Sequence, residues 1–149
     1  MSRYFLLLPL LLGLALGQAF YKGYCASCHM PDAKGIPGLY PPLGPITAYA
    51  CLPEGRAYLV RVVLFGLIGP LRVQGIEYPS TRFMPPFGEL LDDEGVALVL
   101  NDLLKVLRIR GRAFAPEEIS PWRTPRLTPN QVYHVREALL AQNPKPPCP

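Results

Sequence analysis

The clearest hydrophobic periodicity in the chain lies between residues 91 and 108. Apolar side chains recur there at intervals of three and four positions, namely Val96, Val99, Leu100, Leu103, Leu104 and Leu107. This spacing predicts an amphipathic helix with one continuous apolar face. Asp92 is the predicted amino-terminal cap, and Leu91 and Val96 are placed to form a hydrophobic staple around it.

Three other segments carry helical signals. A helix is expected over about residues 53–65, because a proline stands in its first turn and a glycine follows its end. A last helix is expected over about residues 128–142, where a threonine cap is followed by proline. A single helical turn is expected at residues 116–119.

The remaining segments are shorter or irregular. The first helix is expected to begin near Phe20 and to include residues 25–29, with the 91–108 helix packed against it. Residues 35–45 contain so many glycines and prolines that neither a helix nor a central strand is expected there. Residues 71–78 partly alternate between apolar and polar side chains, which indicates a short hairpin or an extended loop.

The amino terminus has the features of an export signal. Arg3 precedes an apolar run over residues 4–16, and the small residues that follow suit cleavage by a signal peptidase. The run is shorter than a bilayer-spanning helix, so cleavage of a signal peptide over residues 1–19 is favoured over a retained anchor. We therefore expect an exported, periplasmic protein with no stable membrane span after cleavage.

Length and charge narrow the domain count and the classes of partner. The chain has 149 residues, which fits one small domain. Its 15 basic and 11 acidic side chains give a formal net charge of +4, a mild excess that favours docking on acidic protein surfaces. Nucleic acid is not an expected partner, because the chain contains no basic run that would follow a phosphate backbone.

The candidate chemistry is concentrated in residues 25–29, which read Cys-Ala-Ser-Cys-His. This pattern is typical of covalent attachment of a c-type haem. Thiols at Cys25 and Cys28 can reach both vinyl groups of one porphyrin, and His29 then lies beneath the ring to ligate the iron. A redox dithiol would need a βαβ context, and a structural zinc site would need a second Cys/His pair. The sequence supplies neither.

A second axial ligand is found by elimination. Haem iron in electron-transfer cytochromes is commonly held between His and Met. Of the three methionines, Met1 belongs to the export signal and Met30 adjoins His29, so it cannot reach the opposite face. Met84 remains, within a proline-rich loop that holds its backbone. The alternative ligand is His134, which we expect at an exposed position of the last helix.

The loop over residues 35–45 has a predicted role beside the haem. A backbone carbonyl from Pro41 or Pro42 is placed to bind the second ring nitrogen of His29 and to fix the orientation of that ring.

Cys51 and Cys148 are left over after haem attachment. In an exported chain such a pair favours a disulfide that joins the tail to the body. Two free thiols are the alternative, and the sequence does not decide between them.

Several segments together resemble class I c-type cytochromes, and more narrowly the single-haem subunits that accompany periplasmic sulfite and alcohol dehydrogenases. They are the export signal and residues 24–29, 38–43, 84–87 and 91–97. The resemblance covers about residues 20–123. It implies a small all-α bundle around one covalently bound haem c, with Cys25 and Cys28 in thioethers, His29 as the proximal ligand and Met84 as the distal one. Residues 124–149 are expected to add a C-terminal helix and a proline-rich tail.

These features predict an electron-transfer protein rather than an enzyme. With both axial positions filled by the protein, the iron has no open site for a substrate. Electrons would arrive from a dehydrogenase and leave toward a cytochrome oxidase or another cytochrome, by weak docking near the exposed haem edge. Two alternatives stay open: a tightly bound subunit of a dehydrogenase complex, and a haem enzyme or sensor with a labile sixth ligand.

Overall fold

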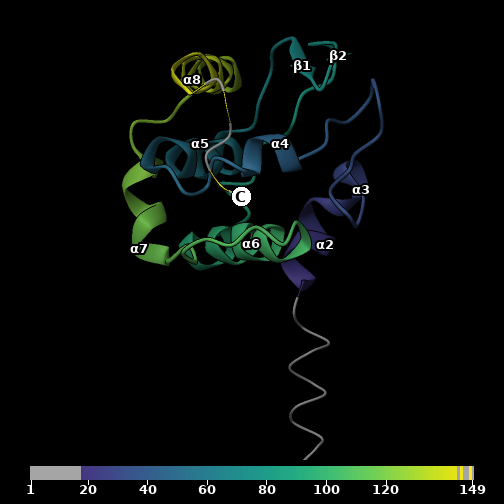
Figure 1. The fold of residues 1–149 in the computed structure, drawn as a ribbon. Helices are drawn as coiled ribbons and strands as arrows, with labels where there is room; N and C mark the ends of the chain where they lie inside the picture. The colour runs from purple at the N-terminus through teal and green to yellow at the C-terminus, as the bar shows by residue number, and fades with distance from the viewer. Residues whose placement is uncertain (1–17, 144, 146–147, 149) are drawn as a thin grey trace, which may run out of the picture.

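Three long helices and a short amino-terminal helix frame the described part of the molecule. They are α2 (Ala19–Tyr24), α5 (Pro53–Phe65), α6 (Asp93–Val106) and α8 (Pro129–Gln142). In Figure 1, α5 lies between α6 and α8 and contacts both of them, while α2 packs against α6. The computed structural model describes residues 18–143, 145 and 148, so the predicted signal peptide lies almost entirely outside the described residues.

Shorter elements connect these helices. They are α3 (Ala26–His29), α4 (Gly44–Thr47), α7 (Pro116–Ile119), the 3₁₀ helix η1 (Ser120–Arg123), and the strands β1 (Leu71–Val73) and β2 (Ile76–Tyr78). The helical turn predicted at residues 116–119 is confirmed by α7. The prediction that residues 35–45 contain no helix is wrong at its end, because α4 begins at Gly44. Proline is tolerated in the first turn of a helix, where its missing N–H would have no partner in any case.

The strands β1 and β2 form the hairpin that was one of the two expectations for residues 71–78. They pair antiparallel, with Leu71 opposite Tyr78 and Val73 opposite Ile76. Gln74 and Gly75 form the two-residue turn, and both have positive φ angles, of 51° and 82°. Such a turn matches the natural twist of the strands that it joins. The prediction of an all-α chain therefore holds only in part: about half of the chain is helical, and a small sheet is also present.

The predicted long helices are confirmed together with their caps. Asp92 accepts a hydrogen bond from Gly95 N at 2.8 Å at the start of α6, and Leu91 beside it is buried. Thr128 and Gln131 form a reciprocal capping box at the start of α8. These local bonds satisfy N–H groups that have no partner within their own helix.

Helix α2 is joined to α6 by one buried carboxylate. Asp102 Oδ2 accepts hydrogen bonds from Phe20 N at 3.0 Å and from Tyr21 N at 3.3 Å. Tyr21 is fully buried, and it packs with Leu103 in a small apolar cluster. A negative charge at a helix amino terminus is favoured by the helix dipole, and here that charge comes from another helix. The predicted packing of the first helix against α6 is therefore confirmed.

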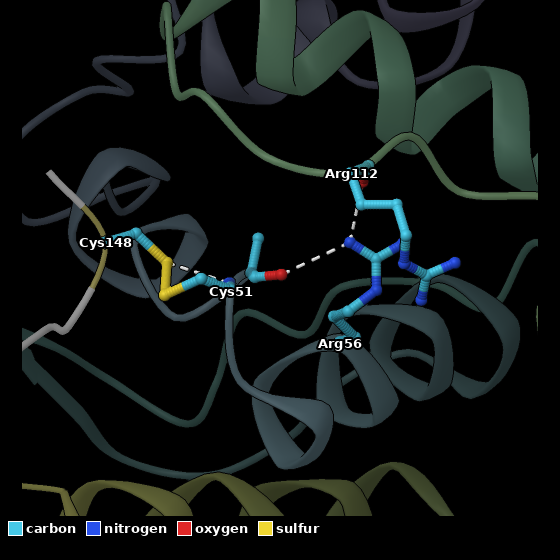
Figure 2. The surroundings of a disulfide bond; sticks show 5 residues. Cys51, Arg56, Arg112 and Cys148 are labelled. Atoms are coloured by element: carbon cyan, nitrogen blue, oxygen red, sulfur yellow. Dashed lines mark hydrogen bonds between the residues drawn. A yellow bond between two sulfur atoms is a disulfide. The ribbon is translucent and has the colours of Figure 1, made fainter.

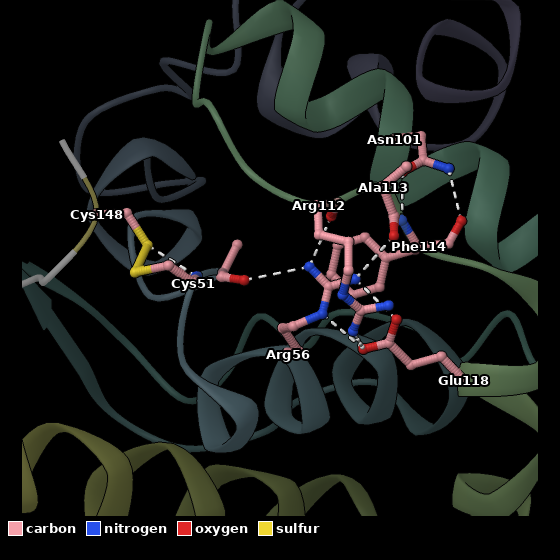
Figure 3. Close-up of polar contacts among 9 residues, drawn as sticks. Cys51, Arg56, Asn101, Arg112, Ala113, Phe114, Glu118 and Cys148 are labelled. Atoms are coloured by element: carbon pink, nitrogen blue, oxygen red, sulfur yellow. Dashed lines mark hydrogen bonds and ion pairs between the residues drawn. A yellow bond between two sulfur atoms is a disulfide. The ribbon is translucent and has the colours of Figure 1, made fainter.

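Arg56 of α5 ties three segments together, as Figure 3 shows. Its guanidinium donates to Glu118 Oε2 of α7 at 2.7 Å and to the carbonyl of Arg112 at 2.8 Å. It also stacks 3.8 Å from the ring centroid of Phe114. Buried charges are tolerated when they are paired and hydrogen-bonded in this way. The network fixes the irregular segment between α6 and α7.

The structure joins Cys51 and Cys148 in a disulfide, which Figure 2 shows beside Arg56. The two Cα atoms are 5.7 Å apart, within the ordinary range for such a bond. Cys148 N also donates to the carbonyl of Ala48 at 3.1 Å. The question that the sequence left open is thus answered in favour of the disulfide.

Replacing Asp102 tests the connection between α2 and α6. Asp102→Ala leaves the N–H groups of Phe20 and Tyr21, one partly buried and one buried, without their acceptor, so we expect the free energy of unfolding to fall by about 2–3 kcal/mol. Urea titration of the holoprotein measures this change. Glu89→Ala, which removes an exposed carboxylate paired with Arg126, is the matched control and costs less than about 1 kcal/mol. Equal losses in the two variants would contradict the assigned role of Asp102.

The ion pair between Arg56 and Glu118 predicts a pH dependence. The hydrogen bond from Arg56 holds the pKa of Glu118 below its ordinary value of 4.5. A carboxyl whose folded pKa is depressed contributes stability above its unfolded pKa, and loses that contribution as the pH falls through its folded pKa. Glu118→Gln should therefore cost about 2–3 kcal/mol at pH 7 and progressively less below pH 4.5.

The measurement is a set of unfolding curves collected from pH 7 to pH 3. The proteins compared are the wild type, Glu118→Gln and the control Glu117→Gln. Glu117 is an exposed neighbour on the same helix. A deficit of Glu118→Gln that stays constant over this range would show that ionisation of Glu118 is not the cause.

Candidate functional site

A cavity of about 580 Å³ lies among α3, α4, α5, α6, α8 and the β1–β2 hairpin, and its walls are mostly apolar. Its size is that of a site for a small molecule or a cofactor. The cavity is lined by all four side chains that the sequence singled out, which are Cys25, Cys28, His29 and Met84. Met84, which lies 55 positions after His29 in the sequence, is thus brought to the same site as the motif over residues 25–29.

Cys25 and Cys28 lie one helical turn apart, with Cys25 at the amino-terminal cap of α3. Neither is part of a disulfide. Burial, followed by the nearby Cys28 and Asp102, raises the pKa of Cys25 to about 12. A reactive redox cysteine needs a lowered pKa instead, so burial of Cys25 opposes formation of the thiolate on which a dithiol oxidoreductase depends.

His29 is buried, with 8% of its surface exposed. Its Nδ1 lies 2.9 Å from the carbonyl oxygen of Pro41. Because a carbonyl only accepts hydrogen bonds, Nδ1 carries the proton and Nε2 keeps its lone pair for a metal. Burial lowers the pKa of His29, which favours the neutral ring that ligation requires. Of the two carbonyls that the sequence suggested, the structure selects that of Pro41.

The loop that carries Pro41 is shaped by glycine. Gly35 has a φ of +65°, and its N–H donates to the carbonyl of His29 at 2.9 Å. Ile36 and Tyr40 then exchange two backbone hydrogen bonds of 2.8 Å each. A β-carbon on Gly35 would lie 2.7 Å from the Pro41 oxygen and still closer to the Tyr40 oxygen. Only glycine fits a position with both this backbone angle and this close approach.

Met84 is held by backbone hydrogen bonds at the end of α5. It exchanges two bonds with Leu67, of 2.9 and 3.0 Å. The following loop continues this docking, because Phe87 N donates to the carbonyl of Val63 at 2.9 Å and Gly88 N to that of Leu64 at 3.0 Å. The last carbonyls of a helix lack partners within it, and here the Met84 loop supplies them. The backbone of the Met84 loop is thus held by these hydrogen bonds as well as by its prolines.

His134, the alternative ligand, is exposed on α8 as predicted and does not line the cavity. Its ring packs edge-on against that of Tyr133, with a centroid distance of 5.3 Å. Within residues 18–143, 145 and 148 there is no cluster of three His, Cys, Asp or Glu side chains able to hold a metal ion. Within those same residues, no helix combines the length and apolarity needed to cross a bilayer.

Comparison with known proteins shows the family to which the chain belongs. Residues 13–101 match the family described as cytochrome c oxidase, cbb3-type, subunit III. The chain is 38% identical over 148 residues to a cytochrome c-552 of Thermus thermophilus, which covers 93% of this chain and 98% of that protein. The chain belongs to the cytochrome c family. A second cytochrome c-552 from the same species is 37% identical over 121 residues, which covers 77% of this cytochrome and 90% of the relative.

A more distant relative is a longer protein. The cytochrome is 34% identical over 91 residues to the cytochrome c subunit of alcohol dehydrogenase (quinone) from Gluconobacter oxydans. The match covers 60% of this cytochrome and 18% of the relative.

Membership of this family implies a covalently bound haem c, and the cavity suits that group. Its walls offer apolar contacts to the faces of a porphyrin, and they include two thiols, an imidazole and a thioether, which are the donors that haem c proteins use. The exposed residues Gly23, Tyr24 and Ser27 also line the cavity. A haem held in this cavity would therefore come near the surface beside the two thiols.

The cytochrome also has polar cavity residues that sequence reasoning missed, namely Thr47, Tyr58 and Arg136. Of these three residues, only Arg136 could have been recognised from the sequence pattern. It lies four positions after Val132 and three before Leu139, both of which are buried in the core. This spacing places a charged residue on the apolar face of α8, which is unusual unless the charge has a partner.

The Pro41 loop is tested by a pair of alanine substitutions. Gly35→Ala places a methyl group against the Tyr40 and Pro41 carbonyls, whereas Gly38→Ala shares the positive φ angle and meets no atom within 4 Å. Gly38→Ala should cost about 1–2 kcal/mol from backbone strain, and Gly35→Ala several kcal/mol more.

The midpoint potential of the holoprotein should change in Gly35→Ala, because displacing the carbonyl alters the basicity of His29, and should stay constant in Gly38→Ala. Denaturant unfolding and redox titration measure the two effects. Equal potentials in the two variants would show that the Pro41 carbonyl does not influence the iron.

Proposed function

We propose that this cytochrome carries single electrons in the periplasm through a haem that is attached by Cys25 and Cys28 and ligated by His29 and Met84. The observation that carries the proposal is that one apolar cavity is lined by all four side chains and not by His134. On this proposal both axial positions are filled by the chain itself. An iron ligated in this way transfers electrons and does not bind a substrate, so the protein is a carrier and not an enzyme.

The bound haem supplies one-electron chemistry between ferrous and ferric iron. Each residue then has a defined task. The two cysteine sulfurs anchor the porphyrin, and His29, oriented by Pro41, offers Nε2 to the metal. The thioether of Met84 favours ferrous iron and raises the midpoint potential. The apolar walls exclude water, which limits the reorganisation that accompanies each transfer.

The donor that we propose is a dehydrogenase, and the acceptor is a cytochrome oxidase or another cytochrome. Two similarities support these classes. One relative is named as a cytochrome c subunit of an alcohol dehydrogenase, and the matching family is described as a subunit of an oxidase. The exposed residues Gly23, Tyr24 and Ser27 line the cavity beside the thiols and offer a route for the electron, and brief docking there suits rapid turnover.

The similarity to a dehydrogenase subunit also supports a second candidate, a tightly bound subunit of a single complex. Purification from the native membrane and periplasmic fractions distinguishes the two. A carrier elutes alone, whereas a subunit elutes with a catalytic chain.

Met84→Ala tests the axial ligand. Loss of the thioether should lower the midpoint potential by on the order of 0.1 V, within the range that axial ligands span. It should also open the sixth position, so that the reduced variant binds carbon monoxide rapidly while the wild type binds it poorly. Redox-titrated absorption spectra and carbon monoxide binding measure both effects. Met30→Ala and His134→Ala are the matched controls and should behave as the wild type.

An unchanged spectrum and potential in Met84→Ala would show that Met84 does not ligate the iron. Rapid carbon monoxide binding by the wild type would favour a haem enzyme or sensor with a labile sixth ligand.

A further inference from the structure

Three polar side chains from separate elements line the haem cavity and are almost fully buried. Thr47 at the end of α4 is 0% exposed, Tyr58 of α5 is 2% exposed, and Arg136 of α8 is 7% exposed. Buried polar groups normally have hydrogen-bond partners, and buried charges normally face an opposite charge. For Thr47 and Arg136, the described chain offers fewer partners than this burial calls for.

The hydroxyl of Thr47 is the clearest case. Among the residues that the structure describes, it is the one buried side-chain nitrogen or oxygen without a hydrogen-bond partner. A buried hydroxyl that has lost its contact with water destabilises the fold unless another group binds it. Its position on the cavity wall indicates that the missing partner belongs to the group that fills the cavity.

Arg136 has an incomplete set of contacts. Its Nη1 donates to Glu137 Oε1 at 2.7 Å, but Glu137 is the next residue in the chain and its side chain is 46% exposed. A guanidinium has five N–H donors, so most of this buried charge remains available to another acceptor. Tyr58 lies within the influence of Arg136. Burial raises the pKa of this phenol, and the positive charge of Arg136 opposes that rise.

We propose that Arg136, assisted by Thr47 and Tyr58, binds a propionate carboxylate of the haem. A carboxylate is the anionic part of an otherwise apolar porphyrin, and an arginine fork binds it with two parallel hydrogen bonds. Arg72 and Arg82 also line the cavity, but both are exposed, so water solvates their charges and they need no other partner. The inference rests on the proposed placement of the haem in this cavity.

This proposal gives residues 124–149 a role that the sequence did not assign. Helix α8 carries Arg136 and is fixed at both ends. Ile68 N donates to the carbonyl of Pro129 at 3.2 Å, and Tyr49 Oη donates to that of Asn143 at 2.7 Å. The C-terminal extension is therefore part of the haem site, and it places a positive charge that stabilises ferrous over ferric iron.

The test compares the midpoint potentials of Arg136→Gln and Arg110→Gln holoproteins. Both substitutions remove one positive charge, but Arg110 is exposed and does not line the cavity. Arg136→Gln should shift the ferrous-to-ferric ratio at a fixed potential about tenfold toward ferric, which equals a fall of about 59 mV for a one-electron couple. Arg110→Gln should shift it less than about twofold. Equal shifts would overturn the proposal.

Thr47→Val provides a second measurement, in which the sign of the stability change shows whether the hydroxyl has a partner. Valine has nearly the same shape as threonine, so a hydroxyl that truly lacks a partner makes the variant more stable than the wild type. A hydroxyl that binds a propionate makes the variant less stable. We expect the denaturant midpoint of the holoprotein to fall in Thr47→Val and to stay constant in Thr81→Val, an exposed control. A rise in Thr47→Val would overturn the role of Thr47.

Met84→Ala separates failure of this inference from failure of the proposed function. If the haem does not occupy this cavity, both Met84→Ala and Arg136→Gln leave the potential unchanged. If the haem is there but its propionate binds elsewhere, Met84→Ala lowers the potential and Arg136→Gln matches Arg110→Gln. Should Arg136→Gln not accumulate with haem, Arg136→Lys keeps the charge but loses the planar fork, so it should lower the denaturant midpoint more than Arg110→Lys does. Equal midpoints in these two variants would overturn the proposal.

Discussion

The space between the helices is the constraint on which the fold depends. A cavity of about 580 Å³ with apolar walls interrupts the core of a 149-residue chain. A group that fills it buries these apolar walls, and burial of apolar surface is the dominant favourable term in folding. The haem c of this family is therefore part of the hydrophobic core as well as the carrier of the chemistry, and the helices are arranged around it.

The long helices only frame this space, and short backbone contacts position the candidate ligands. His29 is oriented by the carbonyl of Pro41, whose position depends on the left-handed conformation of Gly35. Met84 is positioned by its exchange of hydrogen bonds with Leu67. In both cases the constraint acts through main-chain atoms, which have few rotatable bonds between them. Such contacts fix a side chain more firmly than packing alone, and this suits a weak thioether ligand.

The sequence predicted what depends on local spacing and missed what depends on tertiary contact. Helices α5, α6 and α8 were found because caps and periodicity lie within each segment. The cysteine and histidine motif was found because its chemistry needs a fixed local spacing. The choice between Pro41 and Pro42 needed the path of a loop, and the disulfide needed the distance between residues 97 positions apart. Thr47 and Arg136 meet at one cavity only after α8 has packed, so no local pattern could pair them.

The disulfide sets a condition on how this protein is made. On the proposed attachment chemistry, Cys25 and Cys28 must be reduced when they meet the vinyl groups, whereas Cys51 and Cys148 must become oxidised in the same chain. Four thiols can pair in several ways, and any bond that captures Cys25 or Cys28 blocks attachment. Maturation therefore has to keep two sulfurs reduced while it oxidises the other two, and the order of these steps matters as much as the final contacts.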